Sequence, residues 1–174
     1  PIHDAFGGEL RLMFCGGAPT DRRLAERFYE LGIPVVVGYG LTEACTVATV
    51  NRLTPFRADS VGRAVDGVEV RILDPDLHGV GQVLVRGPTL MEGYLDEPEL
   101  TGDTLIDGWL HTGDLGWLDA SDHLHLVGRA KNMIVTPGGK NVYPEDIEGM
   151  LSGIPAQSLV VYASSYLFPG DGLE

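Results

Sequence analysis

The chain contains few cysteines, few basic residues and no long apolar run. Cys15 and Cys45 are its two cysteines, too few and too isolated in the sequence to form a disulfide framework or a zinc site. A reducing, cytoplasmic location is therefore expected. No apolar stretch approaches the roughly 20 residues of a membrane span, and no signal peptide opens the sequence. Transient contact with a membrane surface stays possible.

Basic residues are scarce relative to acidic ones. Twelve Lys and Arg stand against 25 Asp and Glu, which gives a formal net charge of −13. This balance argues against a nucleic-acid partner, because such binding depends on neutralising many phosphates. A site for one nucleotide remains compatible with it, since a single small anion needs only a few local donors. With 174 residues, 44% of them hydrophobic, the sequence predicts a globular chain of one domain, or one and part of another.

The first third predicts part of a parallel α/β sheet. Residues 9–17, "ELRLMFCGG", and 33–38, "IPVVVG", are short apolar runs that predict buried strands. Residues 18–32 lie between them and predict a helix. A strand, a helix and a second strand indicate a parallel pair joined by a right-handed crossover.

The helical pattern within residues 18–32 has its own signals. Thr20 is placed to cap the N-terminus and Gly32 to end the helix. Leu24, Phe28 and Leu31 recur at helical spacing, so they are expected to form a core stripe.

From about residue 60 the pattern changes to short strands separated by Gly, Pro and Asp turns. This predicts a small antiparallel, barrel-like subdomain over residues 60–127, with a short helix at 96–105. Within it, "DGWLHTGDLGWLD" places Thr112-Gly113-Asp114 as a tight turn between two apolar, strand-like runs.

Residues 128–174 predict the start of a small α+β domain. "KNMIVTPGG" predicts a strand and turn, and residues 143–153 a helix with Pro144 in its first turn. Residues 158–163, "SLVVYA", predict one more strand. The fold class is thus α/β, or α+β overall, in three parts: 1–59, 60–127 and 128–174.

The hexapeptide "GYGLTE" follows the valine-rich strand at its C-terminal end, where open α/β sheets bind ligands. Tyr39 offers a flat face to a base, Thr42 a hydroxyl to a phosphate, and Glu43 a carboxylate to a magnesium ion bridging the phosphates. The alternative is an ordinary strand-to-helix turn with an exposed acid.

Three further features have both a functional and a plain interpretation. The Asp114 carboxylate suits the adjacent hydroxyls of a ribose, or it marks a simple turn. Arg129, Lys131 and Lys140 concentrate positive charge that could neutralise a phosphate, or they lie in a solvated loop. His123 and His125 share a strand face without a third ligand at suitable spacing, so a metal site there is not expected.

Six segments occur in one order: "FCGGAP", "GYGLTE", "SVGRAV", "GQVLVRGPTLMEGY", "GWLHTGDLGWLD" and "GRAKNMIVTPGGKNVYPEDIE". This succession resembles the second half of adenylate-forming (AMP-binding) enzymes, the superfamily of acyl-CoA synthetases, adenylation domains and luciferases. It is most similar to bacterial long-chain fatty acyl-CoA synthetases.

The resemblance implies a nucleotide-binding role for the first group of residues. Gly17 and Ala18 resemble the segment lining the adenine pocket, and Tyr39 the aromatic residue packed on adenine. Gly38 and Gly40 match the glycines that flank the acyl end. Thr42 matches a phosphate-contacting threonine and Glu43 a magnesium-binding glutamate. The resemblance implies a catalytic role for these two residues and for Arg129.

It also implies roles further along the chain. Asp114 resembles the ribose-binding aspartate, and Arg129 the arginine that meets the nucleotide at a domain boundary. Lys131 lies where the family pivots its small C-terminal domain. Gly138, Gly139 and Lys140 resemble the loop brought over the site for thioester formation.

The implied activity is that of an acid–thiol ligase acting on a fatty acid, ATP and coenzyme A, with Mg²⁺. The carboxylate attacks the α-phosphate of ATP, pyrophosphate leaves, and the thiol of coenzyme A takes the acyl group after the small domain rotates. The family's phosphate-binding loop and its C-terminal lysine have no counterpart here, so we expect a fragment that is inactive alone. Two alternatives stay open: a fatty-acyl-AMP ligase that loads a carrier protein, and a non-catalytic module that retains the fold.

Overall fold

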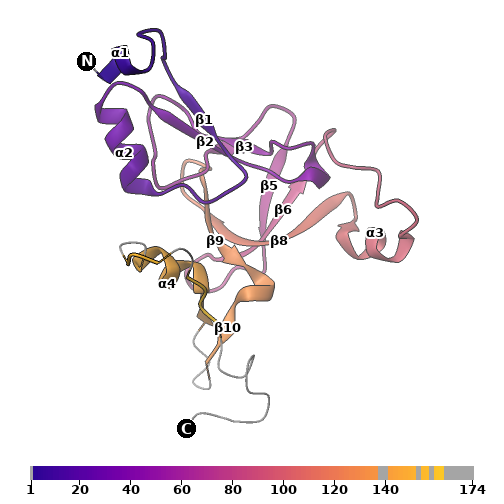
Figure 1. Ribbon diagram of the computed structural model, residues 1–174. Coiled ribbons are helices and arrows are strands. Elements are labelled where there is room, and N and C mark those ends of the chain that lie inside the picture. The colour runs from indigo at the N-terminus through magenta and orange to yellow at the C-terminus, as the bar shows by residue number, and fades with distance from the viewer. Residues whose placement is uncertain (1, 137–140, 152–153, 157–158, 163–174) are drawn as a thin grey trace.

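The computed structural model describes residues 2–136, 141–151, 154–156 and 159–162 (Figure 1). It contains two main sheets and a short hairpin, with helices around them. The mixed α/β architecture expected from the sequence is confirmed. No helix among the described residues has the length and apolar character needed to cross a membrane.

The first sheet is mixed. Its strands, in spatial order, are β1 (Met13–Cys15), β2 (Val35–Tyr39), β3 (Thr49–Val50) and β4 (Arg63–Ala64). β1 and β2 are parallel and are linked through helix α2 (Arg22–Glu30), as predicted, whereas β3 and β4 are added antiparallel. A short helix, α1 (Ile2–Ala5), precedes them.

Helix α2 starts one residue later than expected. The Asp21 side chain caps it by accepting a 2.8 Å hydrogen bond from the Leu24 backbone N–H. The expected cap, Thr20, is wrong: its hydroxyl instead donates to Cys15 Sγ at 3.3 Å. Thr and Asp both favour the N-cap position, so residue type alone does not determine which of two neighbouring residues caps the helix.

The expected core stripe on α2 is also wrong, as is the buried character of β1. Leu24 and Leu31 are 53% and 42% exposed, and Phe14 of β1 is 55% exposed. The helix buries Ala25 and precedes the buried Ile33 instead. Helical period identifies an apolar face, but burial also needs a second surface, and the structure leaves Leu24 and Leu31 exposed.

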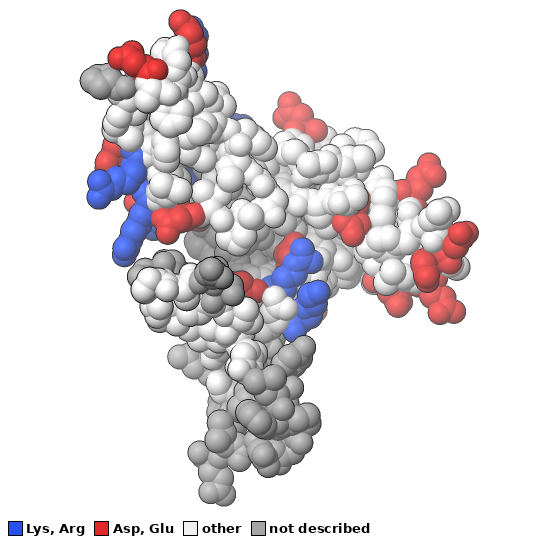
Figure 2. Space-filling model, in the orientation of Figure 1, with Lys and Arg blue, Asp and Glu red and all other residues white. Residues whose placement is uncertain are grey.

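The second sheet is antiparallel throughout. Its strands are β5 (Glu69–Leu73), β6 (Gly81–Arg86), β7 (Leu105–Ile106), β8 (Trp109–Leu118) and β9 (Leu124–Arg129). β8 is central: it pairs with β6, and both β7 and β9 also pair with it. The expected antiparallel subdomain is therefore confirmed. Helix α3 (Pro98–Thr104) projects from this sheet (Figure 1), and Figure 2 shows acidic side chains gathered around it.

The core joins the two sheets. Val83, Leu110 and Leu124 of the second sheet are fully buried, in one cluster with Tyr39 of the first sheet and Ala48, which precedes β3. Burying each leucine contributes about 1.5–3 kcal/mol. This cluster fixes the end of β2 against the middle of β8, which is where the candidate site lies.

The expected turn at Thr112-Gly113-Asp114 is wrong, because all three residues lie inside the ten-residue strand β8. The register with β6 runs from His111 opposite Leu84 to Leu115 opposite Gln82, so the three residues bulge opposite Val83. Gly113 has φ of +72°, a conformation that glycine adopts without strain. A bulge and a turn use the same residue types, and only the partner strand distinguishes them.

The last part contains a hairpin and a helix. β10 (Ile134–Val135) pairs with β11 (Asn141–Val142), and α4 (Pro144–Met150) follows with Pro144 at its first turn, as predicted. The described part of the last expected strand, residues 159–162, is not a strand. Its Val161 N–H donates to Glu148 Oε1 at 2.8 Å.

The expected boundaries at residues 60 and 128 stay predictions. β4 begins at Arg63 but belongs to the first sheet, and β9 ends at Arg129 in the second.

Candidate active site

The site begins at the C-terminal end of β2. β2 is buried along most of its length, and its last residue, Tyr39, is 8% exposed and packs in the core with Ala44 and Ala48. The Tyr39 hydroxyl donates a 2.6 Å hydrogen bond to Asp114 Oδ2. Burial, followed by the hydrogen bond to Asp114, raises the pKa of Tyr39 far above its ordinary value. The Tyr39 phenol therefore stays protonated and acts as a hydrogen-bond donor.

Asp114 is held by the bulge in β8. The Thr112 hydroxyl donates to the Val83 carbonyl oxygen at 2.7 Å and accepts from the Asp114 N–H at 3.0 Å. This side chain thereby bridges the interrupted ladder. Asp114 is only 7% exposed, so its charge needs a partner.

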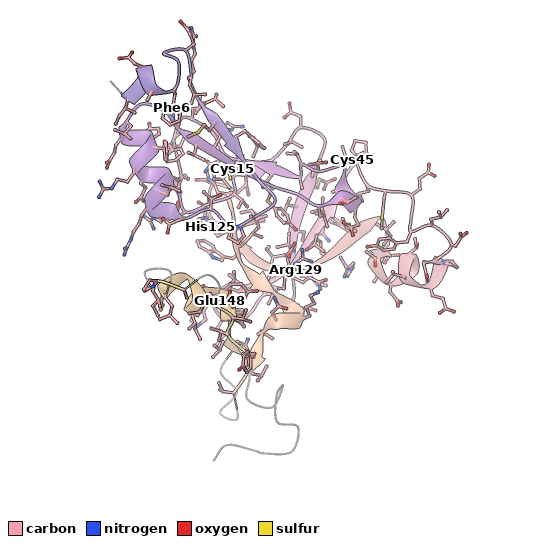
Figure 3. The ribbon with its side chains drawn as sticks, in the orientation of Figure 1. Phe6, Cys15, Cys45, His125, Arg129 and Glu148 are labelled. Atoms are coloured by element: carbon pink, nitrogen blue, oxygen red, sulfur yellow. The ribbon has the colours of Figure 1, made fainter. Side chains whose placement is uncertain are left out.

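Arg129 supplies that partner from the neighbouring strand. Asp114 and Arg129 are register partners across β8 and β9, and Arg129 Nε lies 2.7 Å from Asp114 Oδ1. Figure 3 shows Arg129 at the end of β9, near α4. Its side chain is 49% exposed, so part of the guanidinium remains available to an anion. Both Asp114 oxygens are thus oriented, one by a neutral donor and one by a cation.

The "GYGLTE" segment turns back sharply after β2. The Ala48 N–H donates to the Tyr39 carbonyl at 2.9 Å, and the Thr46 N–H to the Leu41 carbonyl at 3.0 Å. A Cβ added to Gly40 would lie 1.7 Å from the Thr46 carbonyl oxygen. Only glycine permits this closure, which places the 3₁₀ turn η1 (Thr42–Ala44) next to the strand end.

Thr42 and Glu43 both lie on η1. Thr42 is exposed and Glu43 is half-buried. Glu43 Oε1 accepts a 2.9 Å hydrogen bond from the Tyr94 hydroxyl, while Oε2 has no hydrogen-bond partner among the described residues. Burial, followed by the hydrogen bond to Glu43, raises the pKa of Tyr94. A carboxylate with one oxygen held and one free suits a divalent cation.

The remaining predicted residues differ in how close they lie to these side chains. Gly16 lies beside Gly38, because a Cβ on Gly16 would be 3.3 Å from the Gly38 carbonyl oxygen. Gly17 and Ala18 follow Gly16 in the chain and are exposed. Lys131 is exposed on η2 (Ala130–Asn132), two residues beyond Arg129.

Direct contact therefore joins Tyr39, Asp114 and Arg129, three residues that the sequence selected independently. Gly38, Gly40, Thr42 and Glu43 are continuous with Tyr39 in the chain. The predicted loop residues Gly138, Gly139 and Lys140 lie outside the described residues.

Two residues of this arrangement received no role from the sequence. Thr112 was placed in a turn, and its part in the bulge depends on β6. Tyr94 belongs to the quoted motif "GQVLVRGPTLMEGY", which was the available signal, but its contact with Glu43 spans 51 residues.

A separate polar cluster surrounds Asp119, which directly follows β8 in the connection to β9. His123 and His125 are buried, 4% and 5% exposed. Asp119 Oδ1 accepts from the His123 N–H at 2.9 Å, Asp119 Oδ2 lies 3.1 Å from Arg57 Nη1, and His125 stacks on Trp117. Figure 3 shows His125 away from Arg129. Among the described residues, no three side chains are grouped to hold a metal ion.

Comparisons with known proteins identify the family of this chain. The model of the family described as "AMP-binding enzyme" matches residues 2–95, more than half of the chain. The chain belongs to the AMP-binding enzyme family. The chain is similar to long-chain-fatty-acid–CoA ligase heimdall of Drosophila melanogaster, with 39% identity over 153 residues, or 87% of this chain and 22% of that protein. A feruloyl-CoA synthase of Amycolatopsis sp is 40% identical over 84% of this chain and 31% of that protein.

Solved structures agree with this membership. O-succinylbenzoate coenzyme A synthetase from Bacillus subtilis, in complex with ATP and magnesium ion, superposes with a TM-score of 0.74 and 30% identity. The match covers 82% of this chain and 31% of that chain. The chain spans roughly a fifth to a third of the length of the curated relatives it matches.

Proposed function

We propose that this chain is part of an ATP-dependent acyl-CoA ligase that activates a carboxylic acid as its acyl-adenylate and transfers it to coenzyme A. The contact that carries the proposal is the Asp114 carboxylate, fixed by Tyr39 and Arg129 beside the "GYGLTE" turn. Membership of the AMP-binding family and relatives named as CoA ligases support it.

Asp114 is the proposed ribose anchor. An ionised carboxylate can accept two hydrogen bonds side by side, which matches the adjacent hydroxyls of a ribose. Tyr39 and Arg129 fix its orientation in advance, so little ordering is required when the nucleotide binds. Arg129 can shift from Asp114 toward the nucleotide because half of its side chain is exposed.

Thr42 and Glu43 are the proposed phosphate-end residues. Both are on η1, directly after the strand that carries Tyr39, so base, ribose and phosphate contacts would follow one another in space. Glu43, with Oε2 free, fits a magnesium ion by donor type. That ion would offset negative charge on the phosphates when the pyrophosphate leaves. Gly17, Ala18 and Gly38 are proposed to border the adenine and acyl ends.

Lys131, Gly138, Gly139 and Lys140 are proposed to act in the second half-reaction. Lys131 follows the last strand of the second sheet and precedes the β10–β11 hairpin, a suitable place for a hinge. The same proposal includes domain boundaries at residues 60 and 128. It also includes a cytoplasmic location and a full polypeptide longer than this chain.

A long-chain fatty acid is our proposed substrate, on the sequence resemblance and on relatives named long-chain-fatty-acid–CoA ligases. The test supplies the full encoded polypeptide with ATP, Mg²⁺, coenzyme A and acids of short, medium and long chain, together with an aromatic acid. We expect pyrophosphate and acyl-CoA, with the long-chain acids giving the highest kcat/KM. The absence of both products for every acid would refute the ligase proposal.

The choice of acceptor separates the second candidate. A fatty-acyl-AMP ligase would release pyrophosphate with the acid and ATP, yet transfer the acyl group to a carrier protein and not to coenzyme A. The observation that favours this second candidate is the motif "YPEDIE", whose Pro144 begins α4.

A further inference from the structure

Glu43 is held by one loop through both its backbone and its side chain. The Tyr94 hydroxyl donates to Glu43 Oε1 at 2.9 Å, and the Met91 N–H donates to the Glu43 carbonyl oxygen at 2.8 Å. The loop comes from the second sheet, between β6 and α3, whereas Glu43 follows the first sheet. Figure 3 places Cys45, at the end of η1, beside the segment that leads to α3.

Tyr94 is itself fixed by α3. Its backbone N–H donates to Thr101 Oγ1 at 2.9 Å, and the Thr101 hydroxyl donates to the Glu97 carbonyl oxygen at 2.8 Å. Gly93 lies close to the Thr101 side chain, since a Cβ on Gly93 would be 2.8 Å from Thr101 Cγ2. The phenol therefore reaches Glu43 from a backbone anchored to a helix.

We propose that Tyr94 is a positioning residue for the divalent cation that accompanies ATP: its hydroxyl fixes Oε1 of Glu43 so that Oε2 faces the ion. The inference rests on the proposed function, because it requires Glu43 to be the cation ligand. Groups that orient a ligating carboxylate commonly change metal affinity by about 10–100-fold when removed. A Glu side chain also has several rotatable bonds, so an unfixed carboxylate would lose more entropy on binding.

The main variant is Tyr94→Phe, which keeps the ring and removes only the hydroxyl. In the full encoded polypeptide, ATP binding is measured calorimetrically over a series of Mg²⁺ concentrations, and Mn²⁺ binding with ATP by electron paramagnetic resonance. We expect about a tenfold weaker apparent affinity for either cation. At saturating Mg²⁺, kcat should stay close to that of the unmodified protein, and the unfolding temperature should change little.

Tyr29→Phe is the matched control, since Tyr29 stacks on Phe56 and lies in a different element. It should leave the cation affinity unchanged. Thr101→Val loosens the anchor of Tyr94 and should weaken cation affinity in the same direction, by less. If Tyr94→Phe fails to fold, Thr101→Val carries the test, and an unchanged cation affinity in a folded Thr101→Val protein would then overturn the inference.

Glu43→Gln separates this inference from the proposed function. If the unmodified protein shows Mg²⁺-dependent ATP binding that Glu43→Gln abolishes, Glu43 has its proposed role. An unchanged cation affinity in Tyr94→Phe would then overturn the inference alone. If ATP binding in the unmodified protein is independent of Mg²⁺, or Glu43→Gln retains the dependence, the role of Glu43 and the inference both fail.

Discussion

Tyr39 and Asp114 are separated by 75 residues in the chain, yet a 2.6 Å hydrogen bond joins the phenol of one to the carboxylate of the other. The bond crosses from the end of β2 to the bulge in β8, and so connects the two sheets. The Tyr39 ring packs in the core, while its hydroxyl forms this polar contact at the edge of the ring.

The first prediction concerns Asp114→Ala. Removing the carboxylate removes the proposed anchor for the ribose, so the affinity for ATP or AMP should fall by about 1–3 kcal/mol, the value of charge-assisted hydrogen bonds. Calorimetry with the full encoded polypeptide measures this. Asp103→Ala, on α3, is the control and should bind as the unmodified protein does. Equal nucleotide affinity in the Asp114 variant would remove the ribose role.

The second prediction concerns Gly40→Ala. The added Cβ would meet the Thr46 carbonyl oxygen at 1.7 Å and Val47 Cα at 2.8 Å, both backbone atoms that cannot rotate away. We expect a loss of about 3 kcal/mol in the free energy of unfolding, at the upper end of overpacking costs. Nucleotide affinity should fall as well, because Thr42 and Glu43 move with the turn.

Gly102→Ala is the matched control for this prediction. Gly102 lies within helix α3, and a Cβ there meets nothing within 4 Å. Alanine should stabilise the helix by about 0.5–1 kcal/mol. Urea unfolding followed by circular dichroism distinguishes the two. A Gly40→Ala protein as stable as the Gly102→Ala protein would contradict the closure described for the turn.

Local sequence signals predicted the elements whose determinants are local. Helix α4 follows from Pro144 and the acidic first turn, and the β1–α2–β2 unit from the order of its apolar runs. Where a second segment decides the outcome, the same signals failed. Leu24 has helical spacing but is 53% exposed. Thr112-Gly113-Asp114 has turn composition, but β6 holds it within a strand.

The candidate site shows the same division. Tyr39, Asp114 and Arg129 could be selected from the sequence because each lies in a motif of recognisable order. Their mutual contacts could not, because they depend on how two sheets meet. Tyr94 was overlooked as a functional residue for this reason: its motif was visible, while its partner, Glu43, is distant in the chain.

The third prediction concerns acid stability and Asp119. The backbone N–H of His123, together with that of Ser121, holds the pKa of Asp119 well below its usual range. The imidazoles of His123 and His125 and the guanidinium of Arg57 also face this carboxylate. Arg57 likewise lowers the pKa of Asp59, which lies beside His125.

A lowered pKa in the folded state means that the unfolded chain takes up the proton more readily, so acid favours unfolding. The contribution is complete near neutral pH. It begins to decline at about pH 5, as the unfolded chain protonates around its ordinary value of about 3.9, and continues to decline at lower pH.

Asp119→Asn removes the charge but keeps an oxygen for the backbone donors, so at pH 7 we expect it to be about 1–2 kcal/mol less stable. Since the variant has no proton to gain there, its stability should fall less steeply with acid, and the difference between the two curves should narrow from pH 5 to pH 3. Urea unfolding at pH 7, 5, 4 and 3 measures both. A difference between them that stays constant over this range would show that the charge of Asp119 does not support the fold.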